Sequence, residues 1–329
     1  MPTRPRPERR LAALAVLALL ALACAAQAKD TGLVFVSSEK DNAIAIIDAA
    51  KAQLIASPAV CKRPRHMQLS PDRKQLFIAC SDDQRVDIWD IATRKTVAQL
   101  DVGEDPEAFD LSPDGRMLYA SNEEDSALTA FDLLTKKKKF EAKVGGEPEG
   151  VKVSADGKLV YVTSEVASTV HVIDTATGKV VKTIAVGKRP RRFLLAGGEL
   201  WVSSELDGSV SIIRTSDHTV IGKISFLPQG MRAEDVTPVG MALSPDGKTA
   251  YIGLGRANRV AVVDVASRKI KDYLLVGRRA WGLAASRDGK RLYVANGLSD
   301  DMTIIDTTTL KPVKTIRVGR VPYGVVIDD

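Results

Sequence analysis

The chain has 329 residues, 45% of them hydrophobic, so it can bury a sizeable core without metals or disulfides. Its formal net charge is +6, but residues 1–28 hold four arginines and one glutamate, and without them the charge falls by three to +3. A balance this close to neutral gives no basis for binding nucleic acid or an anionic membrane surface. Any charge argument therefore depends on where the charges lie.

The first 28 residues have the layout of a secretory signal peptide. Arginines at positions 4, 6, 9 and 10 precede an apolar run over residues 11–26, and Ala26-Gln27-Ala28 forms a small-x-small cleavage site. The run is too short and too rich in alanine for a membrane span. We expect export, a mature chain from Lys29 and no membrane span after cleavage. A twin-arginine signal at Arg9-Arg10 and lipidation at Cys24 stay open as variants.

A four-residue turn sequence recurs, mostly at a spacing of 42 residues. Its copies are Ser70-Pro71-Asp72-Arg73, Ser112-Pro113-Asp114-Gly115, Ser154-Ala155-Asp156-Gly157, Ser244-Pro245-Asp246-Gly247 and Ser286-Arg287-Asp288-Gly289. A fixed period of this length marks an array of similar supersecondary units. Within the turn, Pro presets φ, Asp bonds its own backbone and Gly takes a positive φ, which together close a hairpin.

Each repeat predicts four short antiparallel strands. In one copy they cover residues 108–111, 117–121, 127–132 and 138–144, separated by turn residues and rich in alternating apolar side chains. Alignment on the proline before each first strand gives six complete units, which we number blades 1 to 6 in chain order: 64–102, 106–144, 148–186, 190–226, 238–276 and 280–318.

The two chain ends complement each other. Residues 33–60 hold three strands and lack a first one, whereas residues 322–327 hold only a first strand. Together they predict blade 7, which closes the ring and removes an exposed sheet edge. The fold class is therefore all-β, a single seven-bladed β-propeller of four-stranded blades over residues 29–329.

Blade 4 departs from the pattern. Its hairpin is shortened to Ala196-Gly197-Gly198-Glu199, and its outlet loop over residues 227–237 is about eight residues longer than the other outlet loops. Long loops on a rigid scaffold often carry function. Elsewhere, Cys61 and Cys80 form an even pair in an exported chain, which favours a disulfide over two free thiols.

Strand alternation places the repeated turns on one face of the propeller, here called the turn face. The loops into the first strands and the turns after the second strands lie on the other face, here called the loop face. The residue after each loop proline, or after Ala280 at the corresponding place in blade 6, should lie at the mouth of the central channel. These seven residues are Arg65, Glu107, Glu149, Arg191, Val239, Trp281 and Tyr323.

The mouth is the predicted site because its residues vary where the scaffold does not require variation. Neighbouring candidates are Arg63, His66, Arg189, Arg192, Arg279 and Arg320. They predict a mouth that is basic over blades 1, 4, 6 and 7 and acidic over blades 2 and 3. Such arginines could bind an anionic ligand, with Trp281 and Tyr323 as a stacking surface, or they could pair with the neighbouring glutamates as a polar rim.

Carboxylates also recur in the turns after the second strands, at Glu39, Glu123, Glu165 and Glu205. They are weak candidates for a calcium site, which needs six to eight converging oxygens, and solvated turn residues are the alternative. The three histidines lie far apart in the repeat frame, and no nucleophile elbow or phosphate loop is present. No catalytic residue is predicted.

The segment Leu-Tyr-Val-Ala-Asn at 292–296, the Val-Gly-x-x-Pro loops and the Ser-Pro-Asp-Gly turns resemble the YVTN family of β-propellers. Over residues 33–329 the chain is most similar to the propellers associated with pyrroloquinoline quinone (PQQ)-dependent catabolism. That resemblance implies a periplasmic location, a link to PQQ or Ca²⁺, and a quinoprotein dehydrogenase as partner. The motifs that carry the resemblance belong to turns and strands, so the resemblance implies no catalytic residue in this chain.

These observations favour a non-catalytic binding or accessory propeller that serves a quinoprotein alcohol oxidation pathway by binding an anionic ligand or a partner protein at the mouth. A metal-dependent, lactonase-like hydrolase and a protein-interaction platform without a small ligand are the alternatives.

Overall fold

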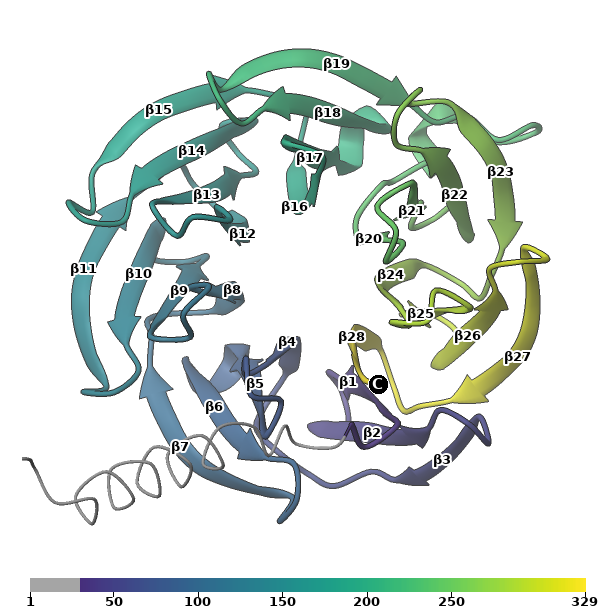
Figure 1. Ribbon diagram of the computed structural model, residues 1–329, viewed down its shortest axis with the longest axis horizontal. Coiled ribbons are helices and arrows are strands. Elements are labelled where there is room, and N and C mark those ends of the chain that lie inside the picture. The colour runs from purple at the N-terminus through teal and green to yellow at the C-terminus, as the bar shows by residue number, and fades with distance from the viewer. Residues whose placement is uncertain (1–29) are drawn as a thin grey trace, which may run out of the picture.

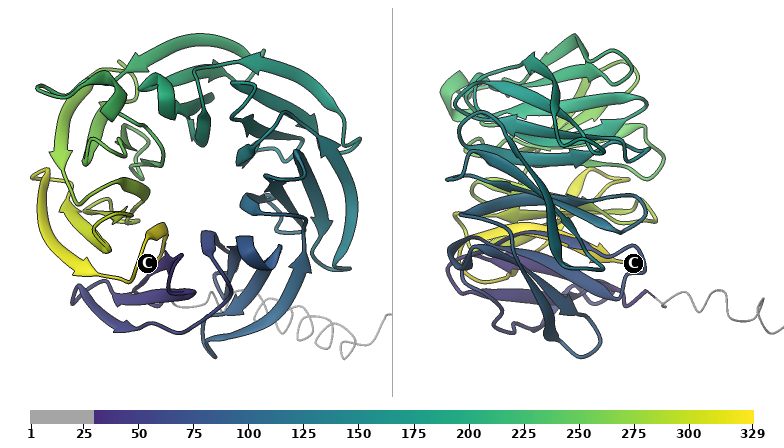
Figure 2. Two further views of the ribbon diagram at one scale, coloured as in Figure 1. Left: turned by 180° about the vertical axis from the view of Figure 1, so that it is seen from behind. Right: turned by 90° about the vertical axis from the view of Figure 1, so that its left-hand side faces the viewer.

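The computed structural model describes residues 30–329, so the predicted signal peptide, Lys29 and Cys24 lie outside the described residues. Seven four-stranded antiparallel sheets form a closed ring around a central channel (Figure 1), and the ring is a short, thick disc in side view (Figure 2). This confirms the predicted seven-bladed propeller. No helix of the described residues is long and apolar enough to cross a membrane.

The strands follow the same order in every blade, from the channel outward. For blades 1 to 7, the innermost strands are β4 (Pro64–Leu69), β8 (Pro106–Leu111), β12 (Pro148–Val153), β16 (Pro190–Ala196), β20 (Met241–Leu243), β24 (Ala280–Ala285) and β28 (Pro322–Asp328). The second strands are β5 (Gln75–Cys80), β9 (Met117–Asn122), β13 (Leu159–Ser164), β17 (Glu199–Ser204), β21 (Thr249–Gly253), β25 (Arg291–Asn296) and β1 (Leu33–Ser38).

The outer half of each blade is equally regular. The third strands are β6 (Arg85–Asp90), β10 (Ala127–Asp132), β14 (Thr169–Asp174), β18 (Ser209–Arg214), β22 (Arg259–Asp264), β26 (Asp301–Asp306) and β2 (Ala43–Asp48). The outermost strands are β7 (Lys95–Asp101), β11 (Lys137–Lys143), β15 (Val180–Ala185), β19 (Thr219–Ser225), β23 (Ile270–Leu275), β27 (Lys311–Arg317) and β3 (Gln53–Ala56). Single 3-10 turns lie at Ser81–Asp83, Glu205–Asp207 and Ala233–Asp235.

Ring closure occurs in blade 7, where β28 pairs antiparallel with β1. The register joins Leu33 to Asp328 and Val36 to Val325. Asp328 also accepts hydrogen bonds from the backbone N and the hydroxyl of Thr31, and it forms an ion pair with Arg73 of blade 1. In Figure 1 the C-terminal end lies beside β1, at the inner edge of the ring.

The core consists of apolar layers between neighbouring blades. One cluster joins Val36 and Ile47 of blade 7 to Tyr293 and Ile304 of blade 6, and each of the other blade-to-blade contacts is built in the same way. The middle strands are buried on both faces and rich in β-branched residues, as in Ala43–Asp48. The innermost strands can therefore present polar residues to the channel without loss of the core.

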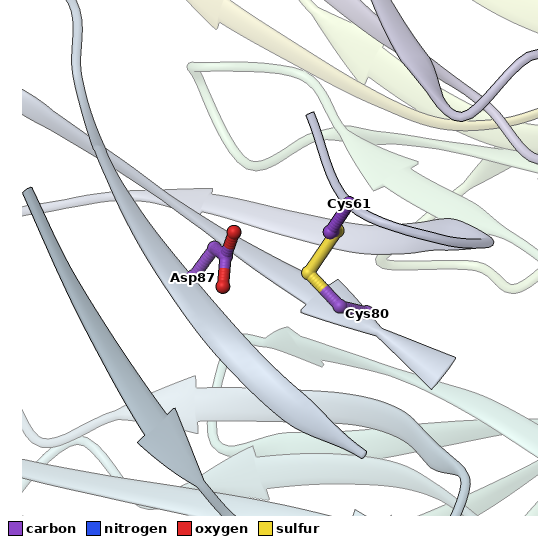
Figure 3. A group of neighbouring side chains, drawn as sticks. All are labelled: Cys61, Cys80 and Asp87. Atoms are coloured by element: carbon purple, nitrogen blue, oxygen red, sulfur yellow. A yellow bond between two sulfur atoms is a disulfide. The ribbon is translucent and has the colours of Figure 1, made fainter. Parts of the chain in front are cut away.

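A disulfide joins Cys61, in the loop that enters blade 1, to Cys80 at the end of β5 (Figure 3). Both cysteines are buried, and the buried side chain of Asp87 lies nearby on β6. Asp87 forms an ion pair with Arg85 at 2.7 Å. The bond anchors the segment that connects the ring-closing blade to the next blade.

Candidate functional site

The seven side chains predicted at the channel mouth meet across the channel. Arg65 is half-buried and the other six are buried, with Glu107 at 0% and Glu149 at 2% exposure. Tyr323 of blade 7 reaches Glu149 of blade 3, donating a hydrogen bond from its hydroxyl to Oε1 at 3.1 Å. We call this layer the plug: Arg65, Glu107, Glu149, Arg191, Val239, Trp281 and Tyr323.

A β-bulge explains why these side chains reach the channel. In six of the seven blades, the pairing of the innermost strand with its neighbour shifts register within the first residues of that strand. A bulge sets two residues against one, so consecutive side chains are re-aimed. Arg65 therefore lines the mouth while His66, the next residue, lines the channel below it.

Hydroxyl groups fix the plug layer to the next blade. The Ser37 hydroxyl accepts a hydrogen bond from Gly324 N at 2.8 Å and donates one to Arg65 O at 2.7 Å. The Thr163 hydroxyl has the same two roles between Gly150 N and Arg191 O. Blades that contribute plug residues are thus joined at the height of the plug.

The charged plug residues are paired with each other. Arg65 forms ion pairs with Glu107 and, at 3.2 Å, with Glu39. Glu149 lies 3.5 Å from Arg191 and 3.0 Å from Arg192. Burial alone would raise the pKa of Glu149, but the charges of these arginines lower it overall. The plug is a buried, charge-balanced network.

Further ion pairs between arginines and carboxylates surround the plug on the loop face. Arg189 and Arg191 each contact both Glu165 and Glu205, and Arg63 contacts Asp105 at 3.2 Å. Arg320 lies farther out, paired with Asp41 at 2.6 Å. The structure thus pairs most of the predicted arginines with carboxylates, as in the polar-rim reading of the sequence.

The four turn glutamates do not converge. Glu39, Glu165 and Glu205 all contact arginines, and only Glu123 lies among other carboxylates, within 4.8 Å of Asp105 and Glu107. Burial raises the pKa of Glu123, and the charges of neighbouring carboxylates add to this effect. Because Arg63 and Arg65 already compensate Asp105 and Glu107, this cluster is part of the paired network.

A pocket of about 230 Å³ opens on the loop face above the plug, between blades 4, 6 and 7. We call it the mouth pocket, and its side chains are Glu39, Arg65, Arg189, Arg191, Arg279, Trp281, Leu298, Val321, Pro322 and Tyr323. Four arginines and one glutamate line it, and three of the arginines, Arg65, Arg189 and Arg191, are paired with carboxylates. Leu298 is half-exposed at its rim.

Arg279 is the arginine of the mouth pocket that forms no ion pair with a described carboxylate. Its guanidinium stacks on the Trp281 ring, 4.5 Å from the ring centre. Burial lowers the pKa of Arg279; the charge of Glu205 acts against this effect, and the charges of Arg191 and Arg256 add to it. An anion beside Arg279 would relieve that repulsion.

Beneath the plug, the central channel forms a separate cavity of about 230 Å³. His66 and Arg192, predicted at the mouth, line this cavity and not the mouth pocket. Its other polar residues, Gln68, Asp110 and Lys152, are not among the predicted site residues. Their spacing of 42 residues at one position of the repeat is the signal that would have found them.

The three histidines lie apart. His66 is in the channel, His171 is on β14, and His218 lies in the turn between β18 and β19, where Tyr161 contacts it at 3.4 Å. Within residues 30–329 no histidine shares a site with a nucleophile and a carboxylate in the manner of a catalytic triad.

Two family models match parts of the chain. A YNCE-like beta-propeller model matches residues 107–196, and a cytochrome D1 heme domain model matches residues 201–324. These matches support a β-propeller family. None of the curated proteins compared with the chain matches it.

Solved structures show the same fold. Hydrazine synthase of Kuenenia stuttgartiensis superposes with a TM-score of 0.76 at 23% identity, covering 84% of this chain and 93% of that chain. A Bacteroides fragilis protein provisionally named a 6-phosphogluconolactonase gives 0.76 at 18% identity, covering 92% and 100%. The dihydro-heme d1 dehydrogenase NirN in complex with DHE gives 0.69 at 17%, covering 99% and 78%. At these identities the likeness shows the fold alone.

Proposed function

We propose that the protein is an exported binding propeller that takes up a planar, carboxylate-bearing ligand in the mouth pocket. The observation that carries this proposal is Arg279, which is stacked on Trp281 and lacks a carboxylate partner within residues 30–329. A guanidinium in this position binds a carboxylate with charge-assisted hydrogen bonds. The Trp281 indole is buried and lies against Arg191 and Arg279, so it fixes the guanidinium rather than the ligand.

The resemblance to PQQ-associated propellers makes PQQ, a quinone with three carboxylates, the first ligand to test. In this proposal the chain acts in the periplasm and supports a quinoprotein dehydrogenase. The mouth pocket, at about 230 Å³, is small beside the ~300–1,000 Å³ of common ligand sites, which favours a compact fused-ring ligand over a macrocycle.

Haem is a second planar, carboxylate-bearing group to consider, because a cytochrome D1 heme domain model matches part of the chain. Its fit depends on whether the mouth pocket offers a ligand for the iron. Haem iron takes an axial ligand from His, Cys, Met or Tyr. Of these types only Tyr323 lines the mouth pocket, and its hydroxyl is engaged with Glu149 and Arg192. The residues of the mouth pocket do not fit a haem iron.

The test is calorimetric titration of the mature chain with PQQ, beside the variants Arg279→Gln and Arg278→Gln. Arg278 is the exposed neighbour that does not line the mouth pocket, so it is the matched control. Loss of a hydrogen bond to a charged group costs about 1.5–3 kcal/mol, so Arg279→Gln should weaken binding about tenfold or more. Absence of saturable heat, or equal effects of the two variants, would refute the proposal. Titration with Ca²⁺ tests the hydrolase alternative separately.

A further inference from the structure

The channel beneath the plug carries a second candidate site, independent of the mouth pocket. The plug separates the two, because its residues are buried while those deeper in the channel are more exposed. The third to fifth residues of β4 include half-buried His66 and Gln68, and Arg192, Leu283 and Val325 of other blades are half-buried too. Solvent therefore reaches this cavity from the turn face.

The charged, amide and imidazole side chains of the cavity wall all come from blades 1 to 4, and the wall of blades 5 to 7 carries none of them. Blades 1 to 4 contribute His66, Gln68, Asp110, Lys152 and Arg192. The apolar side is formed by Phe193, Met241, Leu283 and Val325. This combination of apolar wall and converging polar groups is typical of a small-molecule site.

Asp110 organises the polar half and is itself saturated. It accepts hydrogen bonds from Gln68 Nε2 at 3.0 Å and from Val153 N at 2.9 Å, and Lys152 Nζ lies 2.7 Å away. An ammonium group has three donors, so Lys152 keeps N–H groups for a further acceptor. Its side chain is 34% exposed, to the channel on whose wall it lies.

His66 is the second polar group with unused bonding capacity. Its ring packs edge-to-face on Phe109 at 4.9 Å, and neither ring nitrogen has a hydrogen-bond partner within residues 30–329. Burial lowers the pKa of His66 to about 3, and the charge of Arg192 contributes. At neutral pH the imidazole is uncharged and offers one donor and one acceptor.

At the position of His66, blades 5 to 7 carry Gly240, Gly282 and Gly324, which add no side chain to the cavity wall. A Cβ on each of them would meet the backbone of the neighbouring innermost strand, so these glycines serve strand packing. The apolar wall of blades 5 to 7 faces His66 and Arg192 across the channel. The free donors lie on one side of it and the apolar wall on the other.

We propose that this cavity binds a small organic acid, with its carboxylate on Lys152 and His66 and its short apolar chain against Met241 and Leu283. The ligand enters from the turn face, whatever occupies the mouth pocket. A carboxylate is the matching group because the unused bonding capacity of Lys152 consists of charged N–H donors.

Nuclear magnetic resonance of the three histidines tests the proposal with propionate as probe and 1-propanol as neutral control. The His66 ring signals, assigned with His66→Gln, should shift saturably with propionate and not with propanol. The signals of His171 and His218 should stay unchanged. Absence of a saturable His66 shift, or an equal shift with propanol, overturns the proposal.

Variants localise the site. Lys152→Met should weaken propionate binding tenfold or more, whereas Lys158→Met, an exposed lysine of the same blade, should leave it unchanged. Met241→Trp fills the cavity without changing charge and should also abolish the shift, which covers the case in which Lys152→Met fails to fold. Arg279→Gln should not alter propionate binding, because Arg279 does not line the channel cavity. Failure of the mouth-pocket proposal can therefore be told apart from failure of the channel proposal. Full binding in Lys152→Met and Met241→Trp would refute the assignment.

Discussion

Glu149 shows how strongly single residues of the plug depend on each other. It is 2% exposed and bonded to two arginines and a tyrosine from blades 4 and 7. Burying a carboxylate is costly unless it is paired and hydrogen-bonded, and here each condition is met. Removal of any one partner leaves a charge in a site without solvent, so the plug residues are structural as well as candidate binding groups.

This dependence predicts the effect of Glu149→Gln. Breaking a buried ion pair by removal of one partner typically costs about 3–5 kcal/mol. Arg191 retains Glu165 and Glu205, so we expect a loss near 3 kcal/mol, measured by urea unfolding. Glu147→Gln, two residues earlier and exposed, should change stability by less than about 0.5 kcal/mol. Equal stabilities for the two variants would mean that the plug contributes nothing to folding.

At the scale of elements, the innermost strands are spaced by their glycines. A Cβ on Gly282 would lie 2.2 Å from Tyr323 O of the next blade, and one on Gly150 would lie 2.2 Å from Arg191 O. These contacts are with backbone atoms, which cannot move without displacing a strand. Close approach of the neighbouring innermost strand therefore requires glycine at these positions of blades 3 and 6, whereas blades 1, 2 and 4 carry His66, Ala108 and Arg192 there.

We predict that Gly282→Ala destabilises the protein by about 3 kcal/mol or more, since overpacking costs typically 1–3 kcal/mol and here the obstacle is backbone. Gly146→Ala is the matched control, because its nearest neighbour is a Val166 methyl at 3.4 Å and its φ is not positive. Thermal unfolding of both variants checks this. A stable Gly282→Ala protein would show that the strands separate easily.

The innermost strands also show how much of the fold and of the candidate site can be predicted from the sequence. The repeated turns, the strand order and the ring closure follow from the 42-residue period, and the mouth positions follow from counting one residue past each loop proline. The channel residues Gln68, Asp110 and Lys152 are not predicted from the sequence, because simple alternation does not include the bulge at the start of β4, β8 and β12. The pairing of the arginines was left open, since Arg65 and Glu107 are 42 residues apart and only the closed ring brings their side chains together.

For the whole molecule, closure of the ring depends on β28, the only strand of blade 7 contributed by residues after 320. It covers the edge of β1 with backbone hydrogen bonds and adds the contact of Asp328 with Arg73. An uncovered edge is a template for pairing with another chain.

We therefore expect a chain that lacks residues 322–329 to associate into oligomers or aggregate, as measured by light scattering after size-exclusion chromatography. Loss of Asp329 alone, which leaves β28 complete, is the control and should behave like the full chain. A monomeric, cooperatively folded truncated chain would show that the ring closes with only the three strands β1, β2 and β3 in blade 7.

The plug gives the channel only one open end. A solute that enters from the turn face has to leave the same way, so uptake and release compete for a single passage, and through-flow from one face to the other is blocked. Entry and release of solutes at the loop face are consequently independent of entry and release at the turn face, unless the salt bridges of Glu149 and Arg65 break. The mouth pocket and the channel cavity are thus two separate cavities of one propeller, and occupation of one does not require occupation of the other.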